Sequence, residues 1–435
     1  MAAWCQTARM GRLWRNRDFA LFWAGQSIGD LGTSVSTVVL PLIAVTTLDA
    51  SPFAVGALGA AAWLPWLLIG LPAGAWVDRL PYRPVLVACD LARVALIGSV
   101  PVAAAAGGLR MAQLYAVAFG VGVATVFFQV AYQAYLPTLV DRDDLVEGNA
   151  KLQGSQSVAA VSGPGLGGLL SQVMRPPYAL AVDAASYLVS AVTLLAIRTR
   201  KAPQEPTARE PLRRDVAEGA RYVLADPLLR VLTIAPAAGN PFFAGVTTLA
   251  VLFLVRTVDL QPGVVGLLLA AGGLGSVVGA VLARRIAAAF GTARTVWLSI
   301  ALTYPAALLI PLTGDGWRVA CFVVGFFVLE VGVLVYNVTV IAWRQAYVPP
   351  RLIGRVVATM RFLLYGTIPL GGLLGGALAG WIGVREAMWV LIVGNLVMPL
   401  LLVASPLRRL RDLPEAPAVA TVPTAADGAR TPARH

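Results

Sequence analysis

Charged residues are scarce in this chain of 435 residues, and so are the residue types on which many catalytic and metal sites depend. Only 13% of the residues are charged, whereas about a quarter is usual in soluble globular domains. The only histidine is His435, and the three cysteines, Cys5, Cys89 and Cys321, lie far apart. Histidine-based catalysis, a Cys/His metal site and a disulfide framework are therefore not expected. The sequence predicts neither an enzyme nor a bound cofactor or metal.

Lysine is nearly absent as well, since Lys151 and Lys201 are the only two lysines. No Gly-rich phosphate loop with its lysine occurs, which argues against ATP-driven transport. The net charge of +12 comes almost entirely from arginines that sit between apolar blocks. Nucleic-acid binding would need a basic patch concentrated on a soluble face. We therefore do not expect a nucleic-acid partner.

Apolar residues are abundant and are grouped in long blocks. They make up 58% of the chain, and its mean hydropathy is +0.75. Each block has about 20 residues or more, which as a helix crosses a hydrocarbon core of about 30 Å. Continuous apolar runs, rather than alternation with period two, favour helices over a barrel. The pattern predicts an all-α membrane protein with 12 transmembrane helices. The ranges are 19–48, 53–77, 84–106, 111–135, 151–173, 177–197, 228–255, 263–285, 293–313, 317–343, 355–382 and 385–405.

The basic residues predict the orientation of these helices, because positive residues near the spans are retained in the cytoplasm. One set of loops holds five of the 34 Lys and Arg residues, and the others fall on the opposite side. The five are Arg110, Arg175, Arg256, Arg318 and Arg385. We therefore expect a multi-pass protein of the cell membrane, with its partner the lipid bilayer and with both termini in the cytoplasm.

Two short phrases recur six predicted helices apart. Gln-Ala-Tyr-Leu-Pro at 133–137 returns as Gln-Ala-Tyr-Val-Pro at 345–349, and Leu-Gly-Gly-Leu-Leu at 166–170 returns at 370–374. Both pairs fall on equivalent helices, which predicts two parallel repeats of six helices, the arrangement of the major facilitator fold. The expected units are an N-terminal bundle (1–197), a cytoplasmic linker with an interfacial helix (198–227), a C-terminal bundle (228–405) and a disordered cytoplasmic tail (406–435).

The loop after the second predicted helix reads Gly-Ala-Trp-Val-Asp-Arg-Leu-Pro-Tyr-Arg at 74–83. It resembles the Gly-x-x-x-Asp-Arg-x-x-x-Arg signature of the major facilitator superfamily. The resemblance implies a conformational latch made by Gly74, Asp78, Arg79 and Arg83, with Asp78 facing the positive N-terminal end of the eleventh helix. The alternative is that Arg79 and Arg83 only anchor the topology.

The fifth predicted helix contains Ala-x-x-x-Gly-Pro-x-x-Gly-Gly at 159–168. It resembles the antiporter motif of exporting members of the superfamily and departs from it only at Ala159. Gly163, Pro164, Gly167 and Gly168 would let this helix kink and pack tightly, although an ordinary small-residue contact would use the same residues. The phrases at 13–19, 29–30 and 183–187 resemble the subgroup that contains the enterobactin exporter and macrolide efflux proteins.

Four acids fall within predicted spans, where charges are costly and usually functional. They are Asp30, Asp90, Asp183 and Glu330. At about 1.5 Å per residue, Asp30 lies roughly 16 Å into its helix and Glu330 roughly 20 Å into its own, so both are near the midplane. We hypothesise that these two exchange a proton during transport, with Asp183 as a further candidate that would otherwise cap a helix contact.

Two other charged positions have structural interpretations. Asp90 and Arg93 are spaced i, i+3, which favours a neutralising ion pair. Arg361 could reach toward the membrane surface or pair with an acid. Polar and aromatic residues on the cavity helices of the resembled fold are candidates for substrate contacts, with satisfied packing as the alternative. These candidates are Gln129, Tyr132, Gln133, Asn240, Tyr336 and Asn337.

The resemblance and the buried acids together lead to one functional expectation. It is a monomeric secondary active exporter of a small amphipathic molecule, such as a drug, a siderophore or a secondary metabolite. Proton antiport and alternating access would drive export, so the partners are the substrate and protons, and the proton motive force replaces a cofactor. A uniporter or importer on the same fold and a nontransporting membrane sensor are the alternatives.

Overall fold

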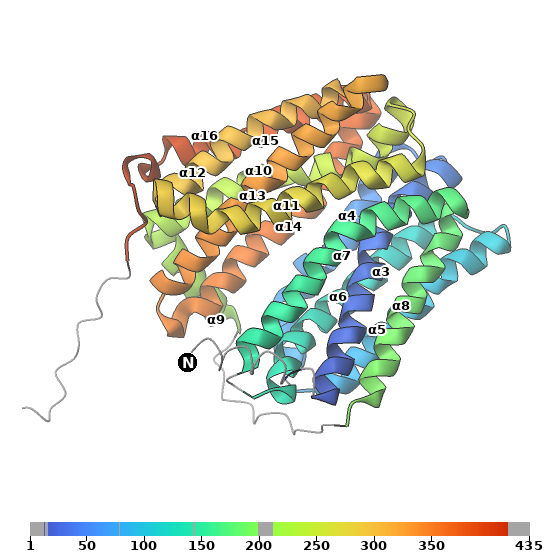
Figure 1. The fold of residues 1–435 in the computed structure, drawn as a ribbon, viewed down its shortest axis with the longest axis horizontal. Coiled ribbons are helices and arrows are strands. Elements are labelled where there is room, and N and C mark those ends of the chain that lie inside the picture. Colours follow the sequence, from blue (N-terminus) through green and yellow to red (C-terminus); the bar gives the residue numbers. More distant parts are fainter. Residues whose placement is uncertain (1–12, 14–15, 78, 142–143, 199–211, 416–435) are drawn as a thin grey trace, which may run out of the picture.

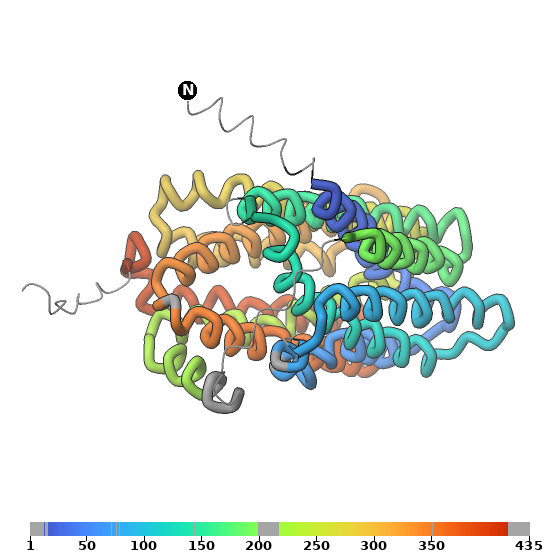
Figure 2. The backbone as a smooth tube through the Cα atoms, turned by 90° about the horizontal axis from the view of Figure 1, so that it is seen from below, coloured from blue at the N-terminus to red at the C-terminus, as the bar shows by residue number. Residues whose placement is uncertain are grey.

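The computed structural model describes residues 13, 16–77, 79–141, 144–198 and 212–415, and all structural statements below concern this part of the chain. Helices form two bundles that lie side by side (Figures 1 and 2). The N-terminal bundle holds α3 (Arg17–Leu42), α4 (Pro52–Val77), α5 (Tyr82–Ala105), α6 (Met111–Leu139), α7 (Leu145–Val173) and α8 (Pro176–Ala196). The C-terminal bundle holds α10 (Pro227–Leu252), α11 (Pro262–Phe290), α12 (Thr292–Thr303), α13 (Val319–Tyr347), α14 (Pro350–Ile382), α15 (Val384–Asn395) and α16 (Val397–Ala404).

Among the described residues, eleven helical segments are long and apolar enough to cross a membrane. Eleven of the twelve predicted spans are among them, and the remaining one, 151–173, forms a helix, α7, that falls below them in hydropathy. Its first half carries Glu147, Lys151, Gln153 and Gln156, and these polar side chains lower its hydropathy. α7 nevertheless packs against α3 and α11, as a helix of the N-terminal bundle that also contacts the C-terminal one.

The basal end of the bundles is the end that holds the first residue of α3 and the last residue of α16. The opposite end is the distal end. The bundles converge at the distal end and diverge toward the basal end (Figure 1). They touch mainly where α4 packs against α14 and where α7 packs against α11. Within the N-terminal bundle, α3 packs against α7 and α8, and α5 packs against α6 and α8.

The same local features start and end the first helix of each bundle. Asn16 and Asp226 both cap a helix N-terminus, since each side chain accepts hydrogen bonds from two backbone N–H groups of the first turn. The π-helices η1 (Ile43–Thr47) and η3 (Phe253–Thr257) then close the distal ends of α3 and α10. Asp49 and Asp259 follow with positive φ values of 46° and 60°. The correspondence supports the internal repeat found in the sequence.

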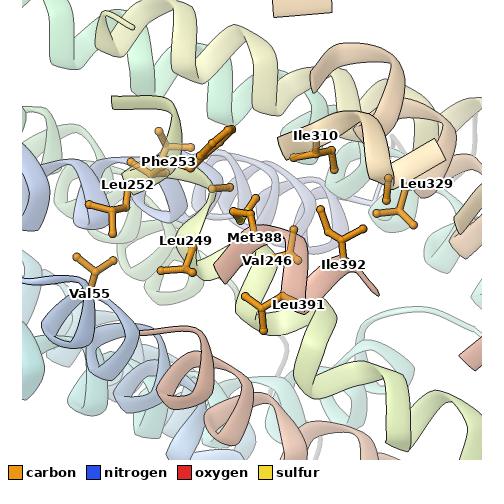
Figure 3. Close-up of a cluster of buried hydrophobic side chains, with 14 of the residues drawn as sticks. Val55, Val246, Leu249, Leu252, Phe253, Ile310, Leu329, Met388, Leu391 and Ile392 are labelled. Carbon is orange, nitrogen blue, oxygen red and sulfur yellow. The ribbon is translucent and has the colours of Figure 1, made fainter. Parts of the chain in front are cut away.

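The larger apolar core is continuous from the C-terminal bundle into the distal end of α4. Val55 of α4 lies opposite Leu249 and Leu252 of α10, and Met388 and Leu391 of α15 complete the layer (Figure 3). All of these side chains are at most 1% exposed. Between membrane helices, such contacts stabilise through close van der Waals packing. The core therefore favours the distal contact between the two bundles.

The chain between the bundles contains α9 (Leu212–Ala225), a helix within the linker predicted at 198–227. Its Gly219 lies against the backbone of Arg355 in α14, and Glu218 forms an ion pair with Arg355. At its end, the Tyr347 hydroxyl donates a hydrogen bond to Asp226 Oδ2 at 2.6 Å. These contacts join α9 to the basal ends of α13 and α14.

The predicted disordered tail is corrected over residues 406–415, while residues 416–435 lie outside the described part of the chain. The 3-10 helix η6 (Pro406–Arg409) follows α16, and Leu407 is fully buried. Asp412 Oδ1 accepts a hydrogen bond from the Thr292 backbone N–H, and Trp343 Nε1 donates one to the Pro414 carbonyl. This segment is therefore held across the basal ends of α12 and α13.

Candidate functional site

Glycines bring the two bundles into close contact at the distal end. A Cβ atom on Gly168 of α7 would lie 2.7 Å from the Gly266 Cα of α11, which only the absence of a side chain permits. On the other interface, a Cβ on Gly56 of α4 would lie 2.8 Å from the Gly376 Cα of α14. The bundles are thus sealed distally by two backbone contacts.

The antiporter-like motif contributes to this seal and to packing within its own bundle. A Cβ on Gly163 would collide with Ser34 of α3, and one on Gly167 would lie 2.8 Å from the Val35 carbonyl oxygen. Pro164 leaves its carbonyl against Gly266 in the other bundle. The motif therefore packs α7 against α3 on one side and α11 on the other, as a helix with small residues can. Its association with export stays a prediction.

Polar groups close the same end. Arg256, which follows α10, reaches the N-terminal bundle and donates from Nη2 to Asp49 Oδ1 at 2.6 Å. It also donates to the carbonyl oxygens of Ala50 at 2.8 Å and Val45 at 3.1 Å. Nearby, Gln172 Nε2 donates to Gln261 Oε1 at 2.9 Å. These bonds cross from one bundle to the other.

Three of the cavities toward the basal end from this seal are lined by candidate site residues. The polar cavity, of about 700 Å³, is bounded by α3, α5, α6, α7 and α8 on one side and by α11 and α13 on the other. The C-terminal cavity, of about 510 Å³, lies among α10, α13, α14 and neighbouring helices. The connecting cavity, of about 210 Å³, lies among α4, α6 and α14. Leu334 and Ile341 line both the polar and the C-terminal cavity, so the two are adjacent.

Asp90 and Arg93 form the ion pair that their spacing predicted, with Nη1 3.1 Å from Oδ1. Both side chains line the polar cavity. Ser190 of α8 donates to the other Asp90 oxygen at 2.6 Å. The guanidinium of Arg93 lies over the rings of Phe128 and Tyr187, at 4.5 and 4.9 Å. The carboxylate is thus compensated by an ion pair and a hydroxyl, and the guanidinium by cation–π contacts.

Asp30 also lines the polar cavity, and its coupling role stays a prediction. Gln26, one helical turn earlier, donates to Asp30 Oδ1 at 2.8 Å. No ion pair to Asp30 exists within the described residues. Its carboxyl group therefore faces the cavity with one neutral hydrogen-bond donor.

Asp183 is placed differently from Asp30. Its side chain is fully buried between α8 and α3, where it accepts a hydrogen bond from Ser36 and another from Ser186 at 3.3 Å. It is not among the residues that line the polar cavity. The arrangement fits the helix-contact alternative, and a coupling role for Asp183 stays a prediction.

Glu330 lies on α13, in the other bundle, and accepts a hydrogen bond from Ser276 of α11 at 3.0 Å. Ser276 lines the polar cavity, whereas Glu330 is not among its lining residues. Asp30 thus lies in the wall of the polar cavity. Glu330 lies outside that wall and is hydrogen-bonded to Ser276, which is part of it. A proton could reach Glu330 by way of the Ser276 hydroxyl.

The six candidate substrate contacts are divided among the cavities. Gln129 lines both the polar and the connecting cavity, and Gln133 lines the connecting one. Tyr132 instead stacks on Phe22 with a ring separation of 5.3 Å and lines none of the three. The remaining three line the C-terminal cavity, and these are Asn240, Tyr336 and Asn337.

Hydrogen bonds reduce the freedom of two of these three residues. Asn240 Nδ2 donates to the Leu364 carbonyl at 2.6 Å, which ties α10 to α14. The Tyr336 hydroxyl donates to the Leu232 carbonyl at 3.3 Å. Asn337 is exposed in the cavity wall. Of the three, Asn337 has the most accessible side chain for a substrate.

The predicted latch is only partly visible. Asp78 lies outside the described residues, and a Cβ on Gly74 would meet nothing within 4 Å. Arg79 is exposed at the turn that follows α4. Arg83 donates from Nε to the Leu194 carbonyl at 2.7 Å and from Nη2 to the Leu195 carbonyl at 2.5 Å. Arg83 therefore satisfies carbonyls at the end of α8, and the latch stays a prediction.

Several contacts were not anticipated from the sequence. Two of them are the hydrogen bond from Ser36 to Asp183 and the contact of Arg93 with the Tyr187 ring. Both depend on the packing of α3, α5 and α8, which no local sequence pattern encodes. The bridge from Arg256 to Asp49 joins residues of different bundles. Arg361 lines two cavities and has no ion pair within the described residues, so the predicted acid partner is absent there.

Comparison with known protein families gives one match over nearly the whole chain. A family model described as "transmembrane secretion effector" matches residues 13–426. The chain is 28% identical over 401 residues to the multidrug efflux pump Tap of Mycolicibacterium fortuitum, which covers 88% of this chain and 93% of that protein. It is 23% identical over 407 residues to macrolide efflux protein A of Streptococcus pyogenes, and the match covers 91% of this chain and 97% of that protein.

Solved structures with the same fold include two types of transporter. The nucleoside transporter NupG matches with a TM-score of 0.74 and 10% identity, covering 89% of this chain and 98% of that one. A bacterial homologue of the lysosomal transporter Spinster, in an inward-facing and unoccupied conformation, matches with a TM-score of 0.67 and 15% identity, covering 89% and 96%. At these identities the likeness establishes the fold and not the substrate.

Proposed function

We propose that the chain exports a small amphipathic molecule. The proposal starts from its membership of the transmembrane secretion effector family, which is part of the major facilitator superfamily. The observation that carries the proposal is a polar cavity between the bundles, sealed distally and bearing the acid Asp30 on its wall. The relatives named as multidrug and macrolide efflux proteins favour the outward direction. A drug, a siderophore and a secondary metabolite all belong to the proposed substrate class.

The orientation follows from the arginines. Five of them, the residues that the sequence assigned to the outer loops, lie at the distal end. Because positive residues are retained on the cytoplasmic side, the basal end with the remaining basic residues is the cytoplasmic one. We therefore propose that both termini are cytoplasmic, in the cell membrane, and that the structure is open toward the cytoplasm. Export requires the bundles to rock so that the same cavity opens distally.

Proton antiport supplies the energy in this proposal. Asp30 takes up a proton when the cavity faces outward and releases it when the cavity faces the cytoplasm, and Glu330 takes part through Ser276. Protonation removes the charge that holds a cationic part of the substrate. The protein acts as a monomer and needs no cofactor, because the proton motive force drives the cycle.

Inside-out membrane vesicles test the proposal. Their interior corresponds to the outside of the cell, so an exporter accumulates a fluorescent amphipathic dye when the interior is acidified. Asp30→Asn and Glu330→Gln should reduce accumulation to near background, while the exposed distal acid gives a matched control, Asp315→Asn, that keeps it. Normal coupled accumulation by both cavity variants would refute the proton role.

The alternatives give different results in the same assay. A uniporter would equilibrate the dye without responding to collapse of the pH gradient, and an importer would drive dye out of these vesicles. A nontransporting sensor would move no dye under any gradient. The sealed distal end and the cavity volume favour a transporter over a sensor.

A further inference from the structure

Two arginines share the wall of the C-terminal cavity without a counterion. Arg344 comes from α13 and Arg361 from α14, and neither forms an ion pair within the described residues. No Asp or Glu occurs among the residues that line this cavity or the connecting cavity. Arg361 is exposed and lines both, so a molecule in either cavity can reach it.

The surroundings of Arg344 leave its charge incompletely satisfied. Its Nη1 lies 3.2 Å from the Met360 sulfur, a weak acceptor, and its buried Nε has no hydrogen-bond partner. Arg93 in the N-terminal bundle offers a contrast, because it has Asp90 and two aromatic rings. A half-buried guanidinium without such compensation is costly, which points to a partner that the described residues do not supply.

Asn395 is a second and independent sign of a ligand. Its side chain lines the same cavity and is only 3% exposed, yet Oδ1 has no hydrogen-bond partner. Buried polar atoms are normally bonded, so each exception needs an explanation. Two polar groups of one bound molecule, an acceptor for Arg344 and a donor for Asn395 Oδ1, would satisfy both residues.

The two adjacent cavities differ in charge. The polar cavity carries Asp30, whereas the C-terminal cavity carries two cations and no acid. Arginine is suited to bind carboxylate, sulfonate and phosphate groups through two parallel hydrogen bonds. We propose that the C-terminal cavity binds an anionic group of the exported molecule at Arg344 and Arg361, while Asn395 Oδ1 accepts a hydrogen bond from a hydroxyl or amine of that molecule. This inference rests on the proposed export function and narrows its substrate class to amphipathic molecules with an anionic group.

Equilibrium binding tests the inference separately from transport. The probes are a rhodamine dye with a free carboxylate and the methyl ester of the same dye, bound to purified protein in neutral detergent and followed by fluorescence polarisation. A charge-assisted hydrogen bond is worth about 1.5–3 kcal/mol, so the wild-type protein should bind the carboxylate form about tenfold more tightly or better. R344Q and R361Q should remove this preference, while R344K and R361K should keep part of it.

The control removes a cation that lines none of the three cavities. R285Q changes an exposed arginine of α11 and should keep the full preference. Equal affinity of the wild-type protein for the two dyes, or a preference that survives in the R344Q/R361Q double variant, would overturn the inference. If the methyl ester still accumulates in the vesicle assay, the proposed export function would hold even though the inference about the anionic group had failed.

A membrane lipid is the other source of an anionic group. Phosphatidylglycerol added at the dye concentration should not displace the carboxylate dye. Displacement by this lipid, with no displacement by neutral phosphatidylcholine, would assign the two arginines to a headgroup and overturn the substrate inference.

Discussion

Arg256 of the C-terminal bundle is bonded to Asp49 of the N-terminal bundle at 2.6 Å, across the distal boundary between them. Asp49 is 95% exposed, so the ion pair alone contributes less than about 1 kcal/mol. The two carbonyl bonds from Arg256 add to it, which makes the arginine more important than the acid.

Arg256→Gln should therefore shift the protein toward the distally open state. The loss of the charged bonds is worth about 1–2 kcal/mol, which is roughly a tenfold change in the ratio of the two states. Spin labels at the exposed distal residues 106 and 315, one in each bundle, should show a larger population of long distances. Asp49→Asn should have a smaller effect, and Arg110→Gln, at the same end, none. An unchanged distance distribution in the Arg256 variant would contradict this role.

Gly168→Val should disrupt the distal contact of α7 with α11, because the new Cβ would meet the Gly266 backbone. We expect dye export to fall by at least about tenfold, as overpacking typically costs 1–3 kcal/mol. Gly154→Ala on the same helix is the control, since nothing lies within 4 Å of its Cβ. Export at the wild-type level by Gly168→Val would show that the contact is dispensable.

Arg93→Gln should destabilise the N-terminal bundle, because it leaves the buried Asp90 without its cation. Removing one partner of a buried ion pair costs about 3–5 kcal/mol. Thermal unfolding in detergent should show a large fall in Tm for Arg93→Gln and recovery in Asp90→Asn/Arg93→Gln. A double variant as unstable as the single one would mean that the cation–π contacts dominate instead.

Ser36→Ala should lower stability with little change in proton coupling. The substitution removes one of two hydroxyl donors from Asp183, and an unsatisfied buried acceptor costs about 1–3 kcal/mol. Because Asp183 does not line the polar cavity, Asp183→Asn should still accumulate dye in response to a pH gradient. Loss of that response by a folded Asp183→Asn protein would give Asp183 a coupling role.

Local patterns in the sequence were sufficient for the fold and for some contacts. Eleven of the long apolar blocks correspond to helices that are apolar enough to cross a membrane. The block that forms α7 is less apolar than the others because its basal half is polar. The Asp90–Arg93 pair was predictable since its residues are one turn apart on a helix. The loop signature at 74–83 was sufficient for the superfamily, although its acid, Asp78, lies outside the described residues.

Contacts between distant segments were not predictable in the same way. Asp49 and Arg256 meet only because two bundles pack together, and a single sequence holds no record of that meeting. Glu330 was correctly placed within a helix, but its position behind Ser276 depends on how α13 is rotated. That Arg344 and Arg361 have no ion-pair partner among the described residues likewise appears only when all neighbouring helices are in place.

The bonded segment at the end of the C-terminal bundle affects how the protein should be handled. Asp412 and Pro414 bind Thr292 and Trp343, and the buried Leu407 and Leu413 anchor the segment between them. Expression plasmids that shorten the chain before Glu415 would strip these contacts and expose apolar surface. An affinity tag or fluorescent fusion should accordingly be joined downstream of Glu415.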